Sequence, residues 1–176
     1  DSQTMATAAL FTFSAVSVQA APFMIVCNDE KQSTDEHGKP ILSTSGKDSV
    51  VIVDLANPLT TKIVAKLPLK NSIVGPPVNV AIDPIGAIAL VADSVDVVKS
   101  GDALKTVPDD KIYVIDLKAK PAKLIATLTG AKQPSGLSIN AAGTLALVAN
   151  RAGKSITSYR SKGKGWQSAR TAGLPP

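Results

Sequence analysis

Short apolar runs recur along the chain and are separated by turn-forming residues. The run Ala-Leu-Val-Ala-Asn at residues 146–150 matches Ala-Leu-Val-Ala-Asp at residues 89–93, and a weaker copy, Met-Ile-Val-Cys-Asn, occupies residues 24–28. A second run, Val-Val-Ile-Val-Asp-Leu at residues 50–55, matches Ile-Tyr-Val-Ile-Asp-Leu at residues 112–117. Short runs rich in β-branched residues and bounded by turn residues are typical of β-strands.

The order of these runs predicts a repeated unit. Ile-Asp-Pro-Ile-Gly at residues 82–86 aligns with Ile-Asn-Ala-Ala-Gly at residues 139–143, and each precedes one of the first runs. Asp or Asn followed three residues later by Gly predicts a tight turn between two strands. Further strand-like runs follow the Asp-Leu runs, at residues 62–67 and 123–128. The predicted unit is therefore a four-stranded antiparallel meander, and no long stretch has the apolar period of a helix.

These motifs resemble the blade repeat of YVTN-type and quinoprotein amine dehydrogenase-like β-propellers, in which a strand ending in Asn precedes a Val-x-Val-Ile-Asp strand. The resemblance covers residues 22–160 and implies an all-β fold of about three propeller blades, with blade boundaries near residues 75 and 133. Propellers usually close with about four to eight blades. We therefore expect a fragment of a larger closed propeller. Oligomerisation would complete the ring only if this chain is the whole protein.

The beginning of the chain has a different pattern. Residues 5–20 form an uncharged apolar run that ends in Val-Gln-Ala, as in the h-region and cleavage site of a secretory signal peptide, although a basic n-region is missing. The run is too short and too rich in Ser and Thr to predict a membrane span. We therefore divide the chain into a signal-peptide-like segment, residues 1–20, and a partial propeller domain, residues 21–176. The predicted location is secreted or periplasmic.

Composition and charge change this picture little. Hydrophobic residues make up 44% of the chain and aromatic residues only 3%, so aliphatic side chains must fill the core. The net charge of +5 is uneven, because all 14 acidic residues lie in residues 1–116 and 10 of the 19 basic residues follow. Since these basic residues are scattered among predicted strands, and only Tyr159 and Trp166 could stack on bases, we do not expect a nucleic-acid partner.

Two of the three predicted loops between second and third strands are enlarged. They span residues 29–47 and 94–111, whereas the third spans only residues 151–154. In propellers these loops lie on a face that commonly carries ligands, and long loops in a compact repeat are often functional. The candidate ligand-binding residues are the following polar side chains of the two loops: Asp29, Asp35, His37, Asp96, Asp109 and Asp110.

The chemistry of these residues remains open. Clustered carboxylates and one imidazole could bind a divalent cation, but their spacing matches neither an EF-hand nor an HExxH motif, and a solvated acidic loop is the alternative. We assign no metal site, and no other cofactor is evident. His37 is the single histidine and has no nucleophile elbow nearby, so a catalytic triad is not predicted. Cys27 stands where the other units have alanine, and Asp54 and Asp116 are expected to accept turn N–H bonds.

The sequence favours a secreted or periplasmic scaffold or binding module that recognises a protein or small ligand through the face of the enlarged loops. The alternative is part of a propeller enzyme. Relatives of this fold include lactonase-like hydrolases and the propeller subunit of quinoprotein dehydrogenases, whose sites draw on several blades. No catalytic constellation is evident in the chain, so a non-catalytic role is favoured and the enzyme question stays open. A third possibility is an anionic surface bound by the basic half.

Overall fold

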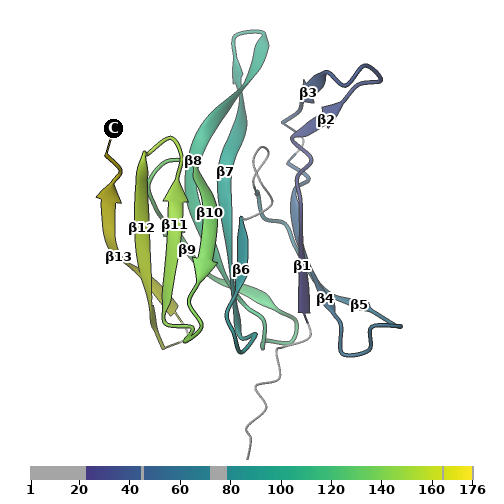
Figure 1. The fold of residues 1–176 in the computed structure, drawn as a ribbon. Helices are drawn as coiled ribbons and strands as arrows, with labels where there is room; N and C mark the ends of the chain where they lie inside the picture. Colours follow the sequence, from purple (N-terminus) through teal and green to yellow (C-terminus); the bar gives the residue numbers. More distant parts are fainter. Residues whose placement is uncertain (1–22, 45, 72–78, 164, 176) are drawn as a thin grey trace, which may run out of the picture.

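The computed structural model describes residues 23–44, 46–71, 79–163 and 165–175. These residues form antiparallel β-sheets and contain no helix, so the all-β prediction is confirmed (Figure 1). Within this part of the chain, no helix is long and apolar enough to cross a membrane. The signal-peptide-like segment, residues 1–20, and the predicted boundary near residue 75 lie outside the described residues.

Three larger sheets follow one another along the chain. The first contains β1 (Phe23–Asn28), β4 (Ser49–Asp54) and β5 (Lys62–Leu67), in that order. The second contains β6 (Val80–Ile82), β7 (Ile88–Ser100), β8 (Ala103–Asp116) and β9 (Lys123–Thr129). The third contains β10 (Pro134–Ile139), β11 (Leu145–Asn150), β12 (Ser155–Lys162) and β13 (Gly165–Gly173). In the second and third sheets, neighbouring strands are consecutive in the sequence and antiparallel, so these two sheets are the four-stranded meanders that the repeats predict.

The predicted tight turns join β6 to β7 and β10 to β11. Asp83 accepts a hydrogen bond of 2.6 Å from the backbone N–H four residues later, and Asn140 accepts one of 2.9 Å at the same relative position. The glycines that follow, Gly86 and Gly143, have φ angles of 61° and 67°. Residues with a side chain rarely adopt this left-handed conformation, which explains the Asp/Asn-x-x-Gly pattern.

Asp54 and Asp116 end β4 and β8 at matching positions. Each accepts a hydrogen bond from the backbone N–H two residues later, at 2.8 Å for Asp54 and 2.9 Å for Asp116. The prediction that these carboxylates stabilise turns is therefore confirmed.

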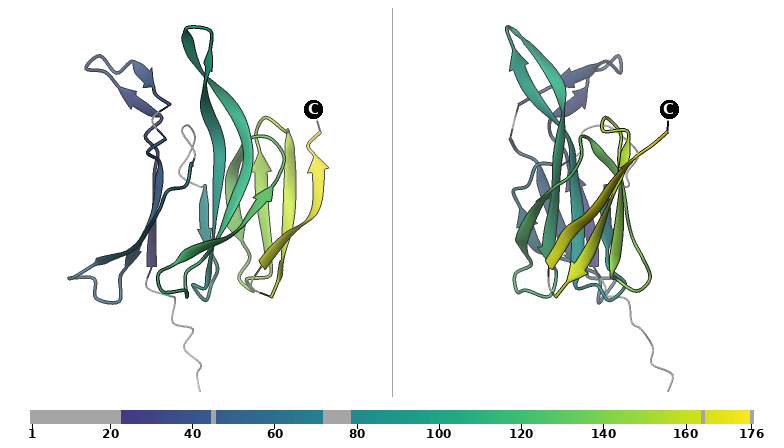
Figure 2. Two further views of the ribbon diagram at one scale, coloured as in Figure 1. Left: turned by 180° about the vertical axis from the view of Figure 1, so that it is seen from behind. Right: turned by 90° about the vertical axis from the view of Figure 1, so that its left-hand side faces the viewer.

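The three sheets stand side by side (Figure 2). Two clusters of buried apolar side chains lie between them. Alternate residues of β7 point in opposite directions. Ala89 and Val91 pack with the first sheet, whereas Leu90 and Ala92 pack with the third sheet. The middle sheet is therefore buried on both faces, and this explains why its strands are continuously apolar.

The second enlarged segment, residues 94–111, is not the loop that the sequence analysis predicts. β7 and β8 continue through it as one paired ladder, from Ile88↔Asp116 to Ser100↔Ala103. The prediction was wrong because polar residues interrupt the apolar pattern, yet Val95 and Val97 alternate with them and are only 6% exposed. Such alternation is typical of a half-buried strand.

The first enlarged segment contains a hairpin of its own. Its strands are β2 (Gln32–Thr34) and β3 (Pro40–Leu42), which pair antiparallel with Ser33 opposite Ile41. This hairpin and the distal half of β7–β8 project from the same end of the molecule (Figures 1 and 2). The two insertions therefore lie on one face, and we call this face the hairpin face.

Candidate functional site

A groove of about 430 Å³ lies between the two projecting hairpins. Its walls are Leu42, Ser43 and Thr44 from the end of the β2–β3 hairpin, and Lys99, Gly101, Asp102 and Leu104 from the tip of β7–β8. Gly101 has a φ of 63°, so this tip turns through a conformation that favours glycine. The groove combines apolar side chains with hydroxyls and one charge of each sign, and it can contact a ligand from two sides.

A buried ion pair anchors the base of the first insertion. Lys31 is 2% exposed, and its ammonium donates hydrogen bonds to the carboxylate of Asp48 and, at 2.5 Å, to the backbone carbonyl of Asn71. Asp48 also accepts hydrogen bonds from the backbone N–H groups of Glu30, at 3.0 Å, and Asn71, at 3.3 Å. Because a buried charge is costly unless it is paired, these bonds fix the entry to the β2–β3 hairpin.

Asp29 belongs to the same network. One carboxylate oxygen accepts a hydrogen bond of 2.9 Å from the backbone N–H of Lys31 and lies 3.8 Å from the Lys31 ammonium. Its other oxygen is buried and has no hydrogen-bond partner among the described residues. Burial raises the pKa of Asp29 above its ordinary value, although the contacts with Lys31 oppose that shift. Asp29 is therefore part of the buried base and not of the groove wall.

Asp93, in β7, has a fully buried carboxyl group. The hydroxyl of Tyr113 donates a hydrogen bond of 3.4 Å to one carboxylate oxygen, and the other oxygen has no partner among the described residues. Burial raises the pKa of Asp93 to about 7, with Lys31 opposing the shift and Asp109 adding to it. Burial also raises the pKa of Tyr113, so its hydroxyl stays protonated and donates to Asp93.

Three ion pairs brace the outside of β7 and β8. Asp96 pairs with Lys70, Asp109 with Lys111 at 2.7 Å, and Asp110 with Lys132 at 2.5 Å. Burial by itself raises the pKa of Asp96, but the hydrogen bonds from Lys70 and a backbone N–H lower it below its ordinary value. These three predicted site residues are therefore engaged with lysines from their own or neighbouring segments.

Asp35 and His37 lie apart from this network, in the turn of the β2–β3 hairpin. Asp35 accepts hydrogen bonds from the backbone N–H groups of His37, at 2.9 Å, and Lys39, at 2.8 Å, so it stabilises the turn. The His37 side chain is 82% exposed and lies 3.6 Å from Glu36. In the part of the chain that the structure describes, no three His, Cys, Asp or Glu side chains gather as a metal-ligand set.

Sequence reasoning missed the residues that carry the buried network. Lys31, Asp48 and Asn71 come from separate segments, and nothing in the local pattern predicts their contact. For Asp93 a signal existed, because it takes the place of Asn28 and Asn150 at the end of the repeated strand. An ionisable residue at a position where the other units have a neutral amide indicates a special environment.

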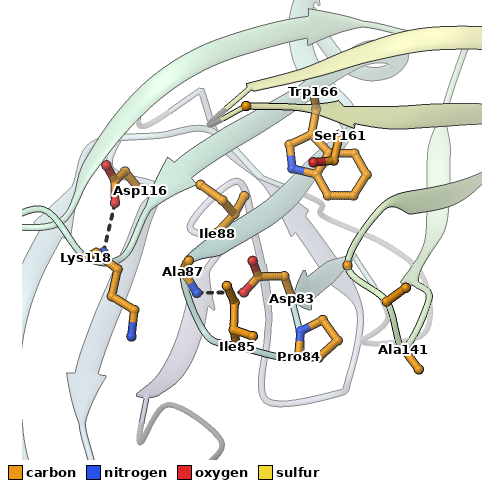
Figure 3. Close-up of a pocket in the computed structure, with 13 residues that line it drawn as sticks. Asp83, Pro84, Ile85, Ala87, Ile88, Asp116, Lys118, Ala141, Ser161 and Trp166 are labelled. Carbon is orange, nitrogen blue, oxygen red and sulfur yellow. Dashed lines mark hydrogen bonds between the residues drawn. The ribbon is translucent and has the colours of Figure 1, made fainter. Parts of the chain in front are cut away.

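A second cavity, of about 400 Å³, opens between the second and third sheets at the opposite end (Figure 3). Asp83, Asp116 and Trp166 line it, together with apolar residues of the β6–β7 turn. Asp83 and Asp116 both accept backbone N–H bonds from their own turns. The carboxylates of this cavity therefore have structural partners within their own turns.

No protein-family model and no curated protein matches the chain. Among solved structures, it is similar to a functionally unknown protein from Desulfotomaculum acetoxidans, with 11% identity and a TM-score of 0.54 over 89% of this chain and 55% of that one. Proteins provisionally named 6-phosphogluconolactonases, from Bacteroides fragilis and Bacteroides uniformis, give TM-scores of 0.47 and 0.30 at 15% and 14% identity. The match with the B. fragilis protein covers 88% of this chain and 55% of that protein. The match with the B. uniformis protein covers 84% of this chain and 67% of that protein.

The first similarity shows a shared fold and says nothing about activity. The two Bacteroides similarities are too low to carry an argument. The chain spans about half the length of the first two proteins, at 55% of each.

Proposed function

We propose that this chain supplies blades of a larger β-propeller whose hairpin face binds a small polar ligand without catalysing a reaction. Meander sheets that stand face to face support the propeller, as does a fold shared with a longer chain, of which this chain covers 55%. A propeller closes with about four to eight blades, so further sheets would flank the three described here. Export from the cytoplasm is a separate prediction, which rests on residues 5–20.

The observation that carries the proposed function is the groove between the hairpins. Two successive sheets each have an insertion at the same end, whereas β11 and β12 of the third sheet are joined by the short turn at residues 151–154. The insertions converge on a groove of about 430 Å³, which lies within the usual range of roughly 300–1,000 Å³ for small-molecule sites. Lys99 and Asp102 would orient a ligand that has both a hydrogen-bond acceptor and a donor.

Four carboxyl groups of β7 and β8 outside the groove wall support binding over catalysis. Asp96, Asp109 and Asp110 are all paired with lysines, and the carboxyl group of Asp93, whose pKa is near neutrality, is fully buried. A general acid or base must reach the proton that it transfers. These groups therefore suit a rigid support beneath a binding surface.

The experiment is a ligand-detected NMR screen of the 176-residue chain with sugars, sugar acids, amino acids and short peptides. We expect at least one compound to bind wild type and to lose about tenfold or more in affinity when Ser43→Tyr or Leu104→Tyr fills the groove. Ile85→Tyr, at the opposite end and 61% exposed in wild type, is the matched control and leaves binding unchanged.

Two results would count against the proposal. Compounds whose binding is unaffected by both groove variants would place the site elsewhere. Hydrolysis of 6-phosphogluconolactone by the wild-type chain, above the uncatalysed rate, would contradict a non-catalytic role and favour the enzyme alternative.

A further inference from the structure

Five turns lie together at the end of the molecule opposite the hairpin face. They join β4 to β5, β6 to β7, β8 to β9, β10 to β11 and β12 to β13 (Figures 1 and 2). The last four line the cavity of about 400 Å³, and the β8–β9 turn lines a further cavity of about 370 Å³ together with Asp54 and Val64 of β4 and β5. We call this end, formed by residues 55–61, 83–87, 117–122, 140–144 and 163, the turn face.

The lysines of the turn face have no acidic partners. Five lysines lie within a turn or at the strand end beside it, and all five are exposed: Lys62, Lys118, Lys120, Lys123 and Lys162. None of them forms an ion pair in the part of the chain that the structure describes. By contrast, four lysines nearer the hairpin face all pair with aspartates: Lys31, Lys70, Lys111 and Lys132. The ammonium groups of the turn face are therefore available to a partner.

The carboxylates at this end are engaged by its own turns. Asp54, Asp83 and Asp116 each accept a hydrogen bond from a turn backbone N–H. Asp83 is only 9% exposed, and the other two are half-buried. Because the carboxylates are drawn into the turns while the five lysines are exposed, the turn face presents positive charge to its surroundings.

Exposed apolar side chains gather at the same end. The three most exposed large apolar residues of the described chain are Leu59, Ile63 and Ile85, at 92%, 70% and 61%. Leu59 lies in the β4–β5 turn, Ile85 in the β6–β7 turn and Ile63 at the start of β5. Both turns are ordered, since the side chain of Asn57 accepts the N–H of Leu59 at 3.0 Å and a backbone hydrogen bond of 2.9 Å closes the β6–β7 turn. The fold therefore holds these side chains in solvent, where a cluster of apolar side chains marks an interaction site.

Exposed aliphatic side chains among unpaired lysines fit the surface of a negatively charged lipid bilayer. Aliphatic side chains enter the boundary between headgroups and acyl chains, and each lysine near anionic headgroups strengthens binding by roughly fivefold. A nucleic acid offers no such apolar layer, and proteins that bind single strands stack aromatic rings on the bases. We propose that the turn face docks on an anionic lipid bilayer, with Leu59 and Ile85 at its apolar boundary.

This surface is defined by the fold and not by the basic half of the sequence. Lys62 belongs to the first half of the chain, whereas Lys132 and Lys154 of the second half lie toward the hairpin face. Docking through the turn face directs the hairpin face away from the bilayer, so the proposal does not depend on ligand binding in the groove. Ser43→Tyr, which fills the groove, should leave lipid binding unchanged, and failure of one proposal is thus distinguishable from failure of the other.

The experiment measures sedimentation of the purified 176-residue chain with lipid vesicles. One set of vesicles contains phosphatidylcholine alone, and the other also contains phosphatidylglycerol, whose headgroup is anionic. We expect binding to be at least about tenfold tighter to the anionic vesicles and to weaken as added salt screens the lysines. Equal binding to both sets, or binding to neither, would overturn the proposal.

Two double variants locate the charged part of the surface. Lys118→Glu/Lys120→Glu should weaken binding to the anionic vesicles by about tenfold or more. Lys39→Glu/Lys105→Glu makes the same change of net charge at exposed positions of the two hairpins, and it should weaken binding by less than about threefold. Equal losses in the two variants would mean attraction by net charge alone and would overturn the assignment to the turn face.

Substitutions of Leu59 test the apolar contact. Leu59→Ser should weaken vesicle binding by about fivefold or more, whereas Ile41→Ser, at a residue of the β2–β3 hairpin that is 49% exposed, should leave it unchanged. Leu59→Trp should shift its fluorescence emission to shorter wavelength on anionic vesicles, and Ile41→Trp should not. A shift in neither variant, or in Ile41→Trp alone, would contradict docking through the turn face. Unchanged affinity in Leu59→Ser, together with equally tight binding of a DNA duplex, would favour a nucleic-acid partner and overturn the proposal.

Discussion

The ammonium of Lys31 and the carboxylate of Asp48 form an ion pair in which both side chains are almost completely buried, at 3% and 2% exposure. The pair joins the start of the first insertion to the residue before β4. Removing one partner leaves an unpaired buried charge, which typically costs about 3–5 kcal/mol. The pair therefore makes the base of the hairpin face rigid.

We predict that Lys31→Met lowers the free energy of unfolding by about 3–5 kcal/mol, because Asp48 then loses its buried counter-charge. Lys70→Ala removes the partner of Asp96 at an exposed site, where Lys70 is 49% exposed, and should cost less than about 1 kcal/mol. Urea denaturation of both variants measures the difference. Equal losses would show that the buried pair has no special role.

The sequence predicts the strands and turns well because their signals are local. Residues 146–150 and 89–93 repeat the same apolar pattern, and Asp83 and Asn140 bond within their own turns. The buried network could not be predicted in this way. Lys31 contacts residues 17 and 40 positions away, and only the packing of the sheets brings those segments together.

The stability of the protein should depend on the pH through Asp93. Its pKa is about 7 in the folded chain, against an ordinary value of 3.8, so the folded state holds the proton more tightly. The stabilising contribution of Asp93 is therefore full below about pH 4, falls as the pH rises, and is lost above about pH 7. Over this range the free energy of unfolding should fall by on the order of 4 kcal/mol.

Asp93→Asn removes this titration and keeps an acceptor for Tyr113. The free energy of unfolding, measured from pH 4 to pH 8 by denaturant titration, should decline less with rising pH in the variant than in wild type. The difference between the two curves isolates Asp93 from the other carboxylates. Parallel curves would mean that Asp93 does not titrate in this range.

Gly130 and Tyr159 should be energetically coupled. Tyr159 is fully buried, and its hydroxyl has no hydrogen-bond partner among the described residues. A Cβ atom on Gly130 would lie 2.6 Å from that hydroxyl. Gly130→Ala should therefore cost about 1–3 kcal/mol in wild type, through overpacking, and clearly less in a Tyr159→Phe background.

Tyr159→Phe alone should be neutral or slightly stabilising, because it removes a buried hydroxyl that lacks a partner. A double-mutant cycle from thermal or urea unfolding gives the coupling energy, which we expect to be about 1 kcal/mol or more. Additive effects of the two substitutions would show that the hydroxyl does not meet the new methyl group.

The central claim is that the described sheets are blades of a larger propeller. A crystal structure of the protein as isolated from its natural source tests it most directly. The account predicts about four to eight meander sheets closed around a channel, with β6 and β10 innermost and both hairpins on one face. An open row of three sheets whose two outer faces are exposed to solvent would contradict it.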